Sequence, residues 1–393
     1  MQSLAAHGRQ AFFFVCFMRS LFLAGVLTCG IAAFPALAGP TPNEHQSLFS
    51  DWAPYVEIDL WRASDAIPIS EFENDWSNGF SPRRGRNVAL MRNLAAAGVE
   101  SNDWRIAYEL RQQAAVDSDR ETLEVVRMYK QRQPPADSAT FHVHAAYTNW
   151  SAQGLRVGHF FDFSGIAGSP LRLYVSGAGY TAQPRYRQEE VSGTVSYLSS
   201  GSYAFNATQT DFNSRGEFPF MKPINATATG VSVSMAADVL LSDALFLKVK
   251  IDDLWSRMRW SNLPVTRRTI NSDVSGTDNE GFVNYRPLLS GRNQQVDASF
   301  PIMRYGAASL SYRTNAWQYG VQVERFAGVT VPTLYVSRDT GWGVVSFMIE
   351  TRFQTVGFGF DYGNFHLSLQ TDTLNPDRAK AQKVQLSYVW AFL

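Results

Sequence analysis

Two side chains near the carboxyl end of the chain, a histidine and a serine, are of types that can carry out ester hydrolysis. His366 and Ser368 stand two residues apart in the segment FHLSL. A histidine that takes the serine proton turns the hydroxyl into a nucleophile able to attack an ester carbonyl. Alternate residues of a β-strand share one face, so a strand would hold both side chains on the same side.

A second candidate is a pair of histidines that could bind a metal ion. His142 and His144 also alternate, and two imidazoles on one face can contribute two of the ligands that zinc requires. No carboxylate or cysteine accompanies them at metal-site spacing, so we expect solvated side chains and no metal. Asp117 and Asp119 resemble part of a calcium loop, but the glycine and distal glutamate are missing, and a turn is expected instead. Glycine-rich phosphate loops are absent, and we predict no cofactor.

The elements that would position these residues are strands of alternating polarity, and the last one is the clearest. From Val384 onward a wholly apolar face alternates with a small or polar face. A tilted strand of about ten residues can cross a bilayer. The pattern predicts a membrane-spanning strand with an aromatic girdle at its periplasmic end, although an amphipathic strand of a soluble domain also alternates. The apolar face consists of Val384, Leu386, Tyr388, Trp390 and Phe392.

This pattern resembles the closing strand of Gram-negative outer-membrane β-barrels, although here Leu393 follows the aromatic residue. Similar alternation recurs along the chain, and in lipid only a closed sheet pairs every backbone donor and acceptor. We therefore predict an all-β fold, a single antiparallel transmembrane β-barrel of about sixteen strands (roughly 14 to 18) with a polar lumen. The barrel is expected to span residues 54–393.

The first 38 residues predict a secretory signal peptide. Arg19 precedes an apolar run that ends in Ala36-Leu37-Ala38, which is a basic start, an apolar region and a small-residue cleavage site. The chain could start at Met1 or at Met18. An uncleaved anchor helix is the alternative. Residues 39–53 are expected to form a polar periplasmic lead.

Composition restricts the class further. The formal net charge is zero, and charged residues are 18% of the chain. Without a strong basic field we expect no nucleic-acid partner. The mean hydropathy of −0.18 argues against a bundle of apolar membrane helices. Both cysteines, Cys16 and Cys29, lie in the predicted signal peptide, so the mature protein would have no disulfide.

The polar faces of the strands carry mixed charges that we expect to line the lumen, because a charge facing mid-bilayer lipid costs roughly 2–4 kcal/mol. Rings of such charges tune permeation in channels. The alternative is that they pair across a closed interior. The candidate lumen residues are Arg105, Glu109, Arg111, Arg156, Arg172, Lys248, Lys250, Arg313, Glu324, Glu350 and Asp361.

Longer connections are expected on the outer side of the membrane. They are residues 63–86, 213–228, 262–293 and 372–383, and residues 262–293 would narrow the lumen if they folded inward. We found no internal repeat and no linker that would imply a second domain.

The His-x-Ser spacing resembles the pair found in the outer-membrane phospholipase and lipid A deacylase families. Three features differ. Leu369-Gln370 follows the serine in place of the Asn or His often found there, no third catalytic group is identifiable, and Phe365, Leu367 and Leu369 should take the lipid face. The pair would then lie in the lumen, and we predict that the protein is not an enzyme.

Two functions from different classes remain. The first is a porin-like passive channel for small hydrophilic solutes in the outer membrane of a Gram-negative bacterium. The alternative is a non-conducting envelope barrel with a structural or export-machinery role, and a lipid hydrolase that uses His366 and Ser368 is a distant third. The expected partners are outer-membrane lipid and small hydrophilic solutes, with a homo-oligomer as an open option.

Overall fold

The computed structural model describes residues 52–166, 169–218, 225–272, 275–277, 283–285 and 288–390. The predicted signal peptide, both cysteines, nearly all of the predicted lead, and Phe392 with Leu393 lie outside the described residues. No helix in the described part of the chain is long and apolar enough to cross a membrane.

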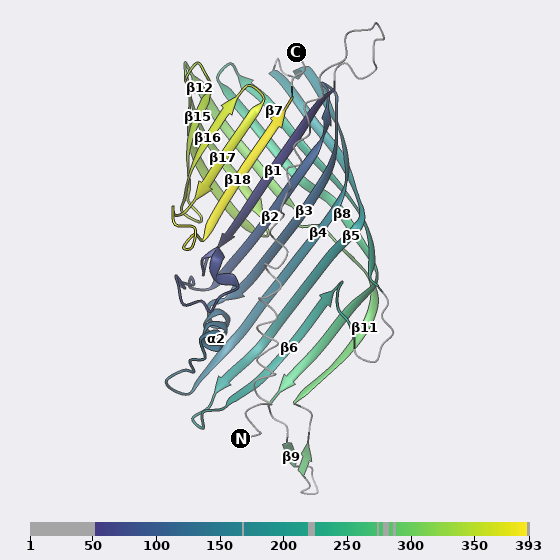
Figure 1. Cartoon of the computed structure of the whole chain (residues 1–393), viewed down its shortest axis with the longest axis vertical. Helices are drawn as coiled ribbons and strands as arrows, with labels where there is room; N and C mark the ends of the chain where they lie inside the picture. The colour runs from purple at the N-terminus through teal and green to yellow at the C-terminus, as the bar shows by residue number, and fades with distance from the viewer. Residues whose placement is uncertain are drawn as a thin grey trace, which may run out of the picture.

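The described strands close into a fourteen-stranded antiparallel β-barrel (Figure 1). Closure follows from two seams. β18 pairs with β1, and β8 pairs with both β7 and β12. In chain order the ring consists of β1 (Ala53–Ser64), β2 (Arg86–Glu100), β3 (Trp104–Asp119), β4 (Ala139–Ile166), β5 (Ser169–Tyr197), β7 (Thr227–Ser242), β8 (Leu245–Asn271), β12 (Tyr305–Thr314), β13 (Trp317–Phe326), β14 (Val329–Asp339), β15 (Val344–Glu350), β16 (Thr355–Tyr362), β17 (Phe365–Thr371) and β18 (Ala381–Val389).

One wall of the barrel continues beyond the ring as an open extension. β6 (Tyr203–Asn213) pairs with the later half of β5 and with the far end of β8, whose other edge pairs with β11 (Leu289–Phe300). The sheet therefore has sixteen strands in the described residues, but β6 and β11 stay outside the ring. The central expectation of sixteen ring strands is not confirmed. A separate pair, β9 (Ser275–Thr277) with β10 (Val283–Tyr285), lies beyond the extension.

Two strands are much longer than the others in the ring except β8. Residues 140–148 and 155–163, two stretches of alternating polarity, both belong to β4, and the two stretches 171–176 and 191–197 both belong to β5. Residues 262–271 continue β8 outward beside β11, so this part of the 262–293 connection does not fold into the lumen.

A helix interrupts the all-β pattern. α2 (Arg120–Gln131) follows β3 directly, and a 3₁₀ turn, η1 (Ile69–Phe72), lies in the connection after β1. Asp119 caps α2, because its carboxylate accepts a hydrogen bond from the Thr122 amide at 2.7 Å. A short polar side chain at this position satisfies one of the free amides at a helix start. Asp117 and Ser118 belong to β3 and Asp119 caps α2, so the predicted turn does not form.

The two rims of the ring differ. β1 begins and β18 ends at the rim drawn at the top of Figure 1, where short turns such as Asn315 and Gly363 join the strands. We call it the terminal rim. The opposite rim, the distal rim, carries α2, η1 and the extension. The described parts of the four connections expected on the outer side lie at the distal rim and in the extension.

Strand alternation separates a polar inner face from an apolar outer face. The outer face exposes Leu155, Val321, Leu334, Phe347 and Phe358, and near the terminal rim it exposes many aromatics. We call this surface the apolar belt. The aromatics near the terminal rim include Trp104, Tyr312, Trp317, Trp342, Tyr362 and Trp390.

Three buried apolar clusters lie toward the distal side. One covers the outer face of β2, β3 and β4 with residues from α2 and the η1 connection, and includes Trp76 and Tyr147. The other two lie on the inner face, one around Trp61 and Phe326 and one around Trp150 and Trp260. The barrel is therefore packed with side chains at this level.

Candidate functional site

All the predicted lumen residues point to the inner face of the ring. The strand registers place Glu57, Lys383 and Glu324 on that face with their cross-strand neighbours. The alternation of the sequence predicts the face of each side chain, and the structure also shows which charged side chains contact one another. Most of them form ion pairs with each other or with charges on other strands.

Arg92 is the centre of the first group. Its guanidinium forms ion pairs with Asp59 on β1 and, at 2.7 Å, with Asp252 on β8. It also lies 3.9 Å from the centroid of the Tyr305 ring. Lys250 approaches Asp252 at 3.6 Å and Glu57 at 3.8 Å. One arginine thus links two strands that are far apart in the sequence.

Arg111 is the centre of the second group. Its Nη1 donates to Asp253 at 2.9 Å and to the Tyr180 hydroxyl at 2.8 Å. The Tyr180 hydroxyl in turn donates to Glu109, which accepts from Arg156 Nε at 2.7 Å. Asp253 has a left-handed backbone (φ 56°) where the pairing of β8 with β7 shifts register. Such a bulge lets adjacent residues 252 and 253 both reach inward.

Together these groups form a crossbar of buried ion pairs through the middle of the ring, defined by Arg92, Arg111, Asp59, Asp252 and Asp253. The five side chains are at most 10% exposed. Removing one partner of a buried pair leaves an uncompensated charge, which costs roughly 3–5 kcal/mol. The crossbar therefore holds β1, β2, β3 and β8 in one arrangement.

A charged cavity of about 190 Å³ lies between the crossbar and the terminal rim. Arg105 lines the cavity, with Nε 2.7 Å from Glu100, and its guanidinium is 4.8 Å from the Tyr55 ring and 5.6 Å from the Phe160 ring. Acidic and basic side chains both line the cavity, so it has no strong single sign. The charged residues that line it are Glu57, Arg92, Arg105, Glu109, Arg111, Arg156, Arg172, Asp238, Lys250 and Asp252.

The other predicted lumen residues divide into rim and deeper positions. Arg172, Lys248 and Arg313 are exposed near the terminal rim, with Arg172 3.6 Å from Asp162. Glu324 is buried and accepts from Lys383 Nζ at 2.6 Å and from the Tyr305 hydroxyl at 2.5 Å.

Glu350 does not face open space. Its carboxylate accepts hydrogen bonds from the backbone amides of Arg352 and Phe353, which closes the turn after β15. Glu350 therefore stabilises a turn at the distal rim.

Sequence reasoning missed Arg92, Asp253 and Lys383 as members of the inner-face network. Arg92 lies in VALMRNL, where both faces are largely apolar and alternation gives no signal. Asp253 follows Asp252 directly, so strict alternation would send it to lipid, and only the bulge turns it inward. A charge within an apolar strand was the one signal available for Arg92.

His366 and Ser368 lie on the inner face of β17, as expected, but their contacts differ. His366 Nδ1 lies 2.6 Å from Asp361 Oδ1, while the buried Ser368 hydroxyl lies 3.8 Å from the sulfur of Met348. His142 is exposed, and its ring nitrogen lies 3.6 Å from Glu121. Within the described ranges, no group of three or more His, Cys, Asp or Glu residues is placed to hold a metal ion.

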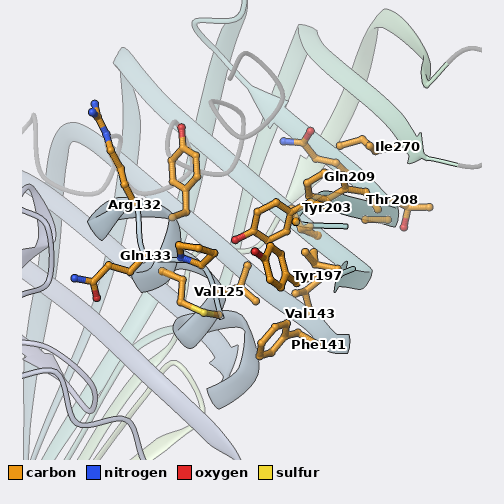
Figure 2. A pocket seen from close by; sticks show the side chains of 18 residues that line it. Val125, Arg132, Gln133, Phe141, Val143, Tyr197, Tyr203, Thr208, Gln209 and Ile270 are labelled. Carbon is orange, nitrogen blue, oxygen red and sulfur yellow. The ribbon is translucent and has the colours of Figure 1, made fainter. Parts of the chain in front are cut away.

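A second cavity, of about 380 Å³, lies against α2 on the outer face of the extension (Figure 2). We call it the α2 pocket. The alternation that points Leu155 outward also points Phe141 and Val143 outward on the same strand. In Figure 2 the rings of Tyr197 and Tyr203 lie together in the pocket, across from Arg132 and Gln133. The lining is mainly apolar and includes Val125, Met128, Tyr129, Phe141, Val143, Val191, Val195, Tyr197, Tyr203, Phe205 and Ile270.

Local sequence explains how α2 comes to form one wall of this pocket. Leu123 and Val126 pack against the strands, whereas Val125, Met128 and Tyr129 turn toward the pocket. The start of the helix covers the free edge of β4. There the Glu121 carboxylate accepts a hydrogen bond from the His142 amide at 2.6 Å, and the Thr122 hydroxyl accepts one from the His144 amide at 2.7 Å. The wall is therefore tied to the sheet by hydrogen bonds as well as by packing.

A polar cluster borders the pocket. Gln209 lines the pocket and donates to Glu189 at 2.5 Å, and Glu189 also pairs with Arg187 at 2.7 Å. Burial raises the pKa of Glu189 to about 7, although Arg187 opposes the shift. The carboxyl group thus keeps its proton to a higher pH than a solvent-exposed glutamate does.

Neither the family models nor the curated proteins include a match to this chain. Solved structures with some similarity include a deletion mutant of the TodX monoaromatic hydrocarbon channel (TM-score 0.39, 10% identity, covering 87% of this chain and 91% of that chain). The P. putida toluene transporter TodX has a TM-score of 0.37 at 10% identity, covering 86% of this chain and 89% of its own. The CymD monoaromatic hydrocarbon channel has a TM-score of 0.25 at 8% identity, covering 87% and 88%. Scores of this size decide neither the fold nor the function of this chain.

Proposed function

We propose that the protein is an outer-membrane barrel that transports small apolar molecules and first binds them in the α2 pocket. The membrane part of the proposal is supported by the apolar belt, since exposed apolar surface of this extent is costly in water. Ring strands such as β12 and β13, of ten residues each, have the length that tilted spanning strands need. We assign the terminal rim to the periplasmic side, because short turns are usual on that side of such barrels.

The α2 pocket is the observation that carries the substrate class. Apolar cavities of about 150 Å³ bind benzene, and this pocket is more than twice that size. Aromatic walls favour edge-to-face and stacked contacts with an unsaturated ligand. The pocket also lies on the distal side, where an incoming molecule would arrive first.

The inner face does not favour passive flow of hydrophilic solutes. The crossbar and the two inner apolar clusters occupy the middle and distal parts of the lumen. The ion pairs of Arg92 with Asp252 and of Arg111 with Asp253 lie in the part of the lumen that a solute would have to pass. We therefore expect the crossbar to restrict passage along the axis.

The proposal is tested by binding of a fluorescent apolar probe to the protein in nanodiscs. Met128→Glu places a charge in the pocket and should weaken binding by at least about tenfold, because a carboxylate loses its hydration there. Glu124→Gln is the matched control on the same helix, since Glu124 pairs with Arg120 away from the pocket. Equal probe affinity in the wild type and in Met128→Glu would count against the pocket.

The passive hydrophilic channel is the second candidate, and the charged cavity at the terminal rim favours it. Planar-bilayer recordings separate the two. Steady ion conductance by the wild type would support the hydrophilic channel, and little conductance together with probe binding would support the apolar carrier. A barrel that neither conducts nor binds the probe would fit the structural or export-machinery role.

A further inference from the structure

A group of arginines lies on the outer surface at the distal edge of the apolar belt. Arg257 and Arg259 belong to β8, Arg304 directly precedes β12, and Arg325 is near the end of β13. All four are exposed. Within the described part of the chain, none of them forms an ion pair with a carboxylate. We call these residues the arginine patch.

The strand registers place the four residues in two pairs. Gly306, which lies opposite Arg325, also lies opposite Ile251 on β8, so Arg257 is six residues further along β8 than this level. Arg257 and Arg259 alternate on one face, about 6.6 Å apart along the strand. Arg325 lies opposite Gly306 on β12, and Arg304 is two residues before that glycine, which makes the two arginines diagonal neighbours at roughly 7–8 Å.

Hydrogen bonds hold two of these side chains near the sheet. Arg304 Nη2 donates to the Leu254 carbonyl on β8 at 2.8 Å, and Arg257 Nε donates to the Ser299 hydroxyl on β11 at 2.9 Å. Each bond uses one donor of a guanidinium that has five. In the described part of the chain, the other donors of these two guanidinium groups have no hydrogen-bond partner.

The patch begins where the apolar belt ends. On β13, Tyr319, Val321 and Val323 are exposed toward lipid, and the next outward residue is Arg325. On β8, Trp255 is 56% exposed and precedes Arg257 on the same face. Tryptophan is enriched at the boundary between hydrocarbon and headgroups. The arginines are therefore at headgroup height if the belt lies in the hydrocarbon.

Neighbouring positive charges without acidic partners repel one another, and an anion between them relieves this repulsion. Guanidinium groups bind phosphate through paired hydrogen bonds, with a geometry that an ammonium group lacks. Anionic lipid headgroups are recognised by basic clusters at this height. A phosphate group carried by a lipid has the negative charge that the arginines would bind and lies at the same height in the membrane.

We propose that the arginine patch binds the phosphate groups of outer-leaflet lipid. The inference rests on the proposed outer-membrane location and is independent of the α2 pocket. The bound lipid would fix the height of the barrel in the membrane on the side of β8, β12 and β13.

The test measures lipid binding to the purified full-length protein in detergent by native mass spectrometry. The ligands are diphosphorylated lipid A, its dephosphorylated form, and inorganic phosphate. The variant Arg257→Gln/Arg259→Gln/Arg325→Gln removes three charges and leaves the Arg304 bond to Leu254 intact. The matched control is Arg338→Gln, because Arg338 is exposed near the terminal rim and lies 5.1 Å from the Trp317 ring.

Diphosphorylated lipid A should bind the wild type and the Arg338→Gln control equally, and the triple variant at least about tenfold more weakly. The corresponding lysine variant should show an intermediate affinity, because it keeps the charge but not the paired geometry. Heat-modifiable migration on gels checks that each variant is folded.

Equal binding of the dephosphorylated lipid would overturn the proposal, since only the acyl chains would then be recognised. Competition by millimolar inorganic phosphate would identify a free-anion site and would also overturn it. Because none of these measurements uses an apolar probe, a failure of the α2 pocket would leave this result unaffected, and the reverse also holds.

Discussion

At the scale of single residues, Arg92 shows how a buried charge depends on its partners. It pairs with Asp59 and Asp252 and is almost completely buried. Pairing of this kind contributes little when both partners are replaced together by neutral groups, but truncation of one partner is costly. The contribution of the crossbar is thus better described as specifying one arrangement of strands than as net stabilisation.

We expect Arg92→Met to lower the free energy of unfolding by roughly 3–5 kcal/mol, because two carboxylates lose their partner inside the barrel. Urea unfolding in detergent, followed by tryptophan fluorescence, measures the change. Adding Asp59→Asn and Asp252→Asn to the same protein should recover most of the loss. If the triple variant were as unstable as Arg92→Met, packing would be the cause and not the unpaired charge.

Glu189 should make the extension sensitive to pH. Its folded-state pKa is raised to about 7 from an ordinary value of 4.5. The folded state therefore binds more protons between these values, and its stability falls as pH rises through that window. Hydrogen exchange of β5 and β6 amides should become faster from pH 5 to pH 7.5 after correction for intrinsic rates.

The matched variant for this pH effect is Glu189→Gln, which keeps the shape of the side chain and removes the titration. The corrected exchange rates of the variant should be nearly constant over the same range. An unchanged pH dependence in Glu189→Gln would assign the effect to another group.

At the scale of elements, α2 decides whether the extension has a pocket. The helix has twelve residues, which is short for independent stability. It depends on its cap, on the Leu123 and Val126 contacts, and on hydrogen bonds to the β4 edge. Loss of any of these should disturb the pocket before it disturbs the ring.

Asp119→Ala should destabilise α2 by about 1 kcal/mol through loss of the N-cap. We expect weaker binding of the apolar probe with no change in the stability of the ring. Asp117→Ala is the control two residues earlier, because Asp117 pairs with the exposed Arg86 and caps nothing. Similar effects of both substitutions on probe affinity would rule out a specific role for the cap.

At the scale of the whole molecule, the width of the strand ring favours an open channel, whereas the side chains inside the ring restrict it. Fourteen strands could enclose space, but the crossbar and the inner apolar clusters fill much of it. We therefore expect the inner side chains to restrict passage, while the ring itself is held by continuous strand pairing.

The double variant Arg92→Ala/Arg111→Ala should increase ion conductance in planar bilayers relative to the wild type. Both substitutions remove crossbar side chains from the lumen and leave the strand pairing in place. Arg338→Ala, on the outer face, is the control and should leave conductance unchanged. If the double variant folds, as judged by heat-modifiable migration, and conducts no more than the wild type, the crossbar is not the barrier.

The sequence by itself determined which face each side chain takes. Alternation with a period of two placed Glu109, Arg156 and Glu324 inside and Leu334 or Phe358 outside, because neighbouring side chains of a strand point to opposite faces. It also indicated a closed antiparallel sheet with longer connections at one end. The α2 helix could have been found from Asp119 at its cap, Glu121 in its first turn, and the spacing of Leu123 and Val126.

Only the tertiary structure decided strand lengths, the number of strands in the ring, and the partners inside it. β4 and β5 continue past the ring because they pair with each other there and β5 also pairs with β6, and nothing local in the sequence records those pairings. Arg92 and Asp252 are 160 residues apart, and their contact depends on how the ring closes. The period of a strand fixes the face of a side chain, whereas the register of closure fixes what it meets across the lumen.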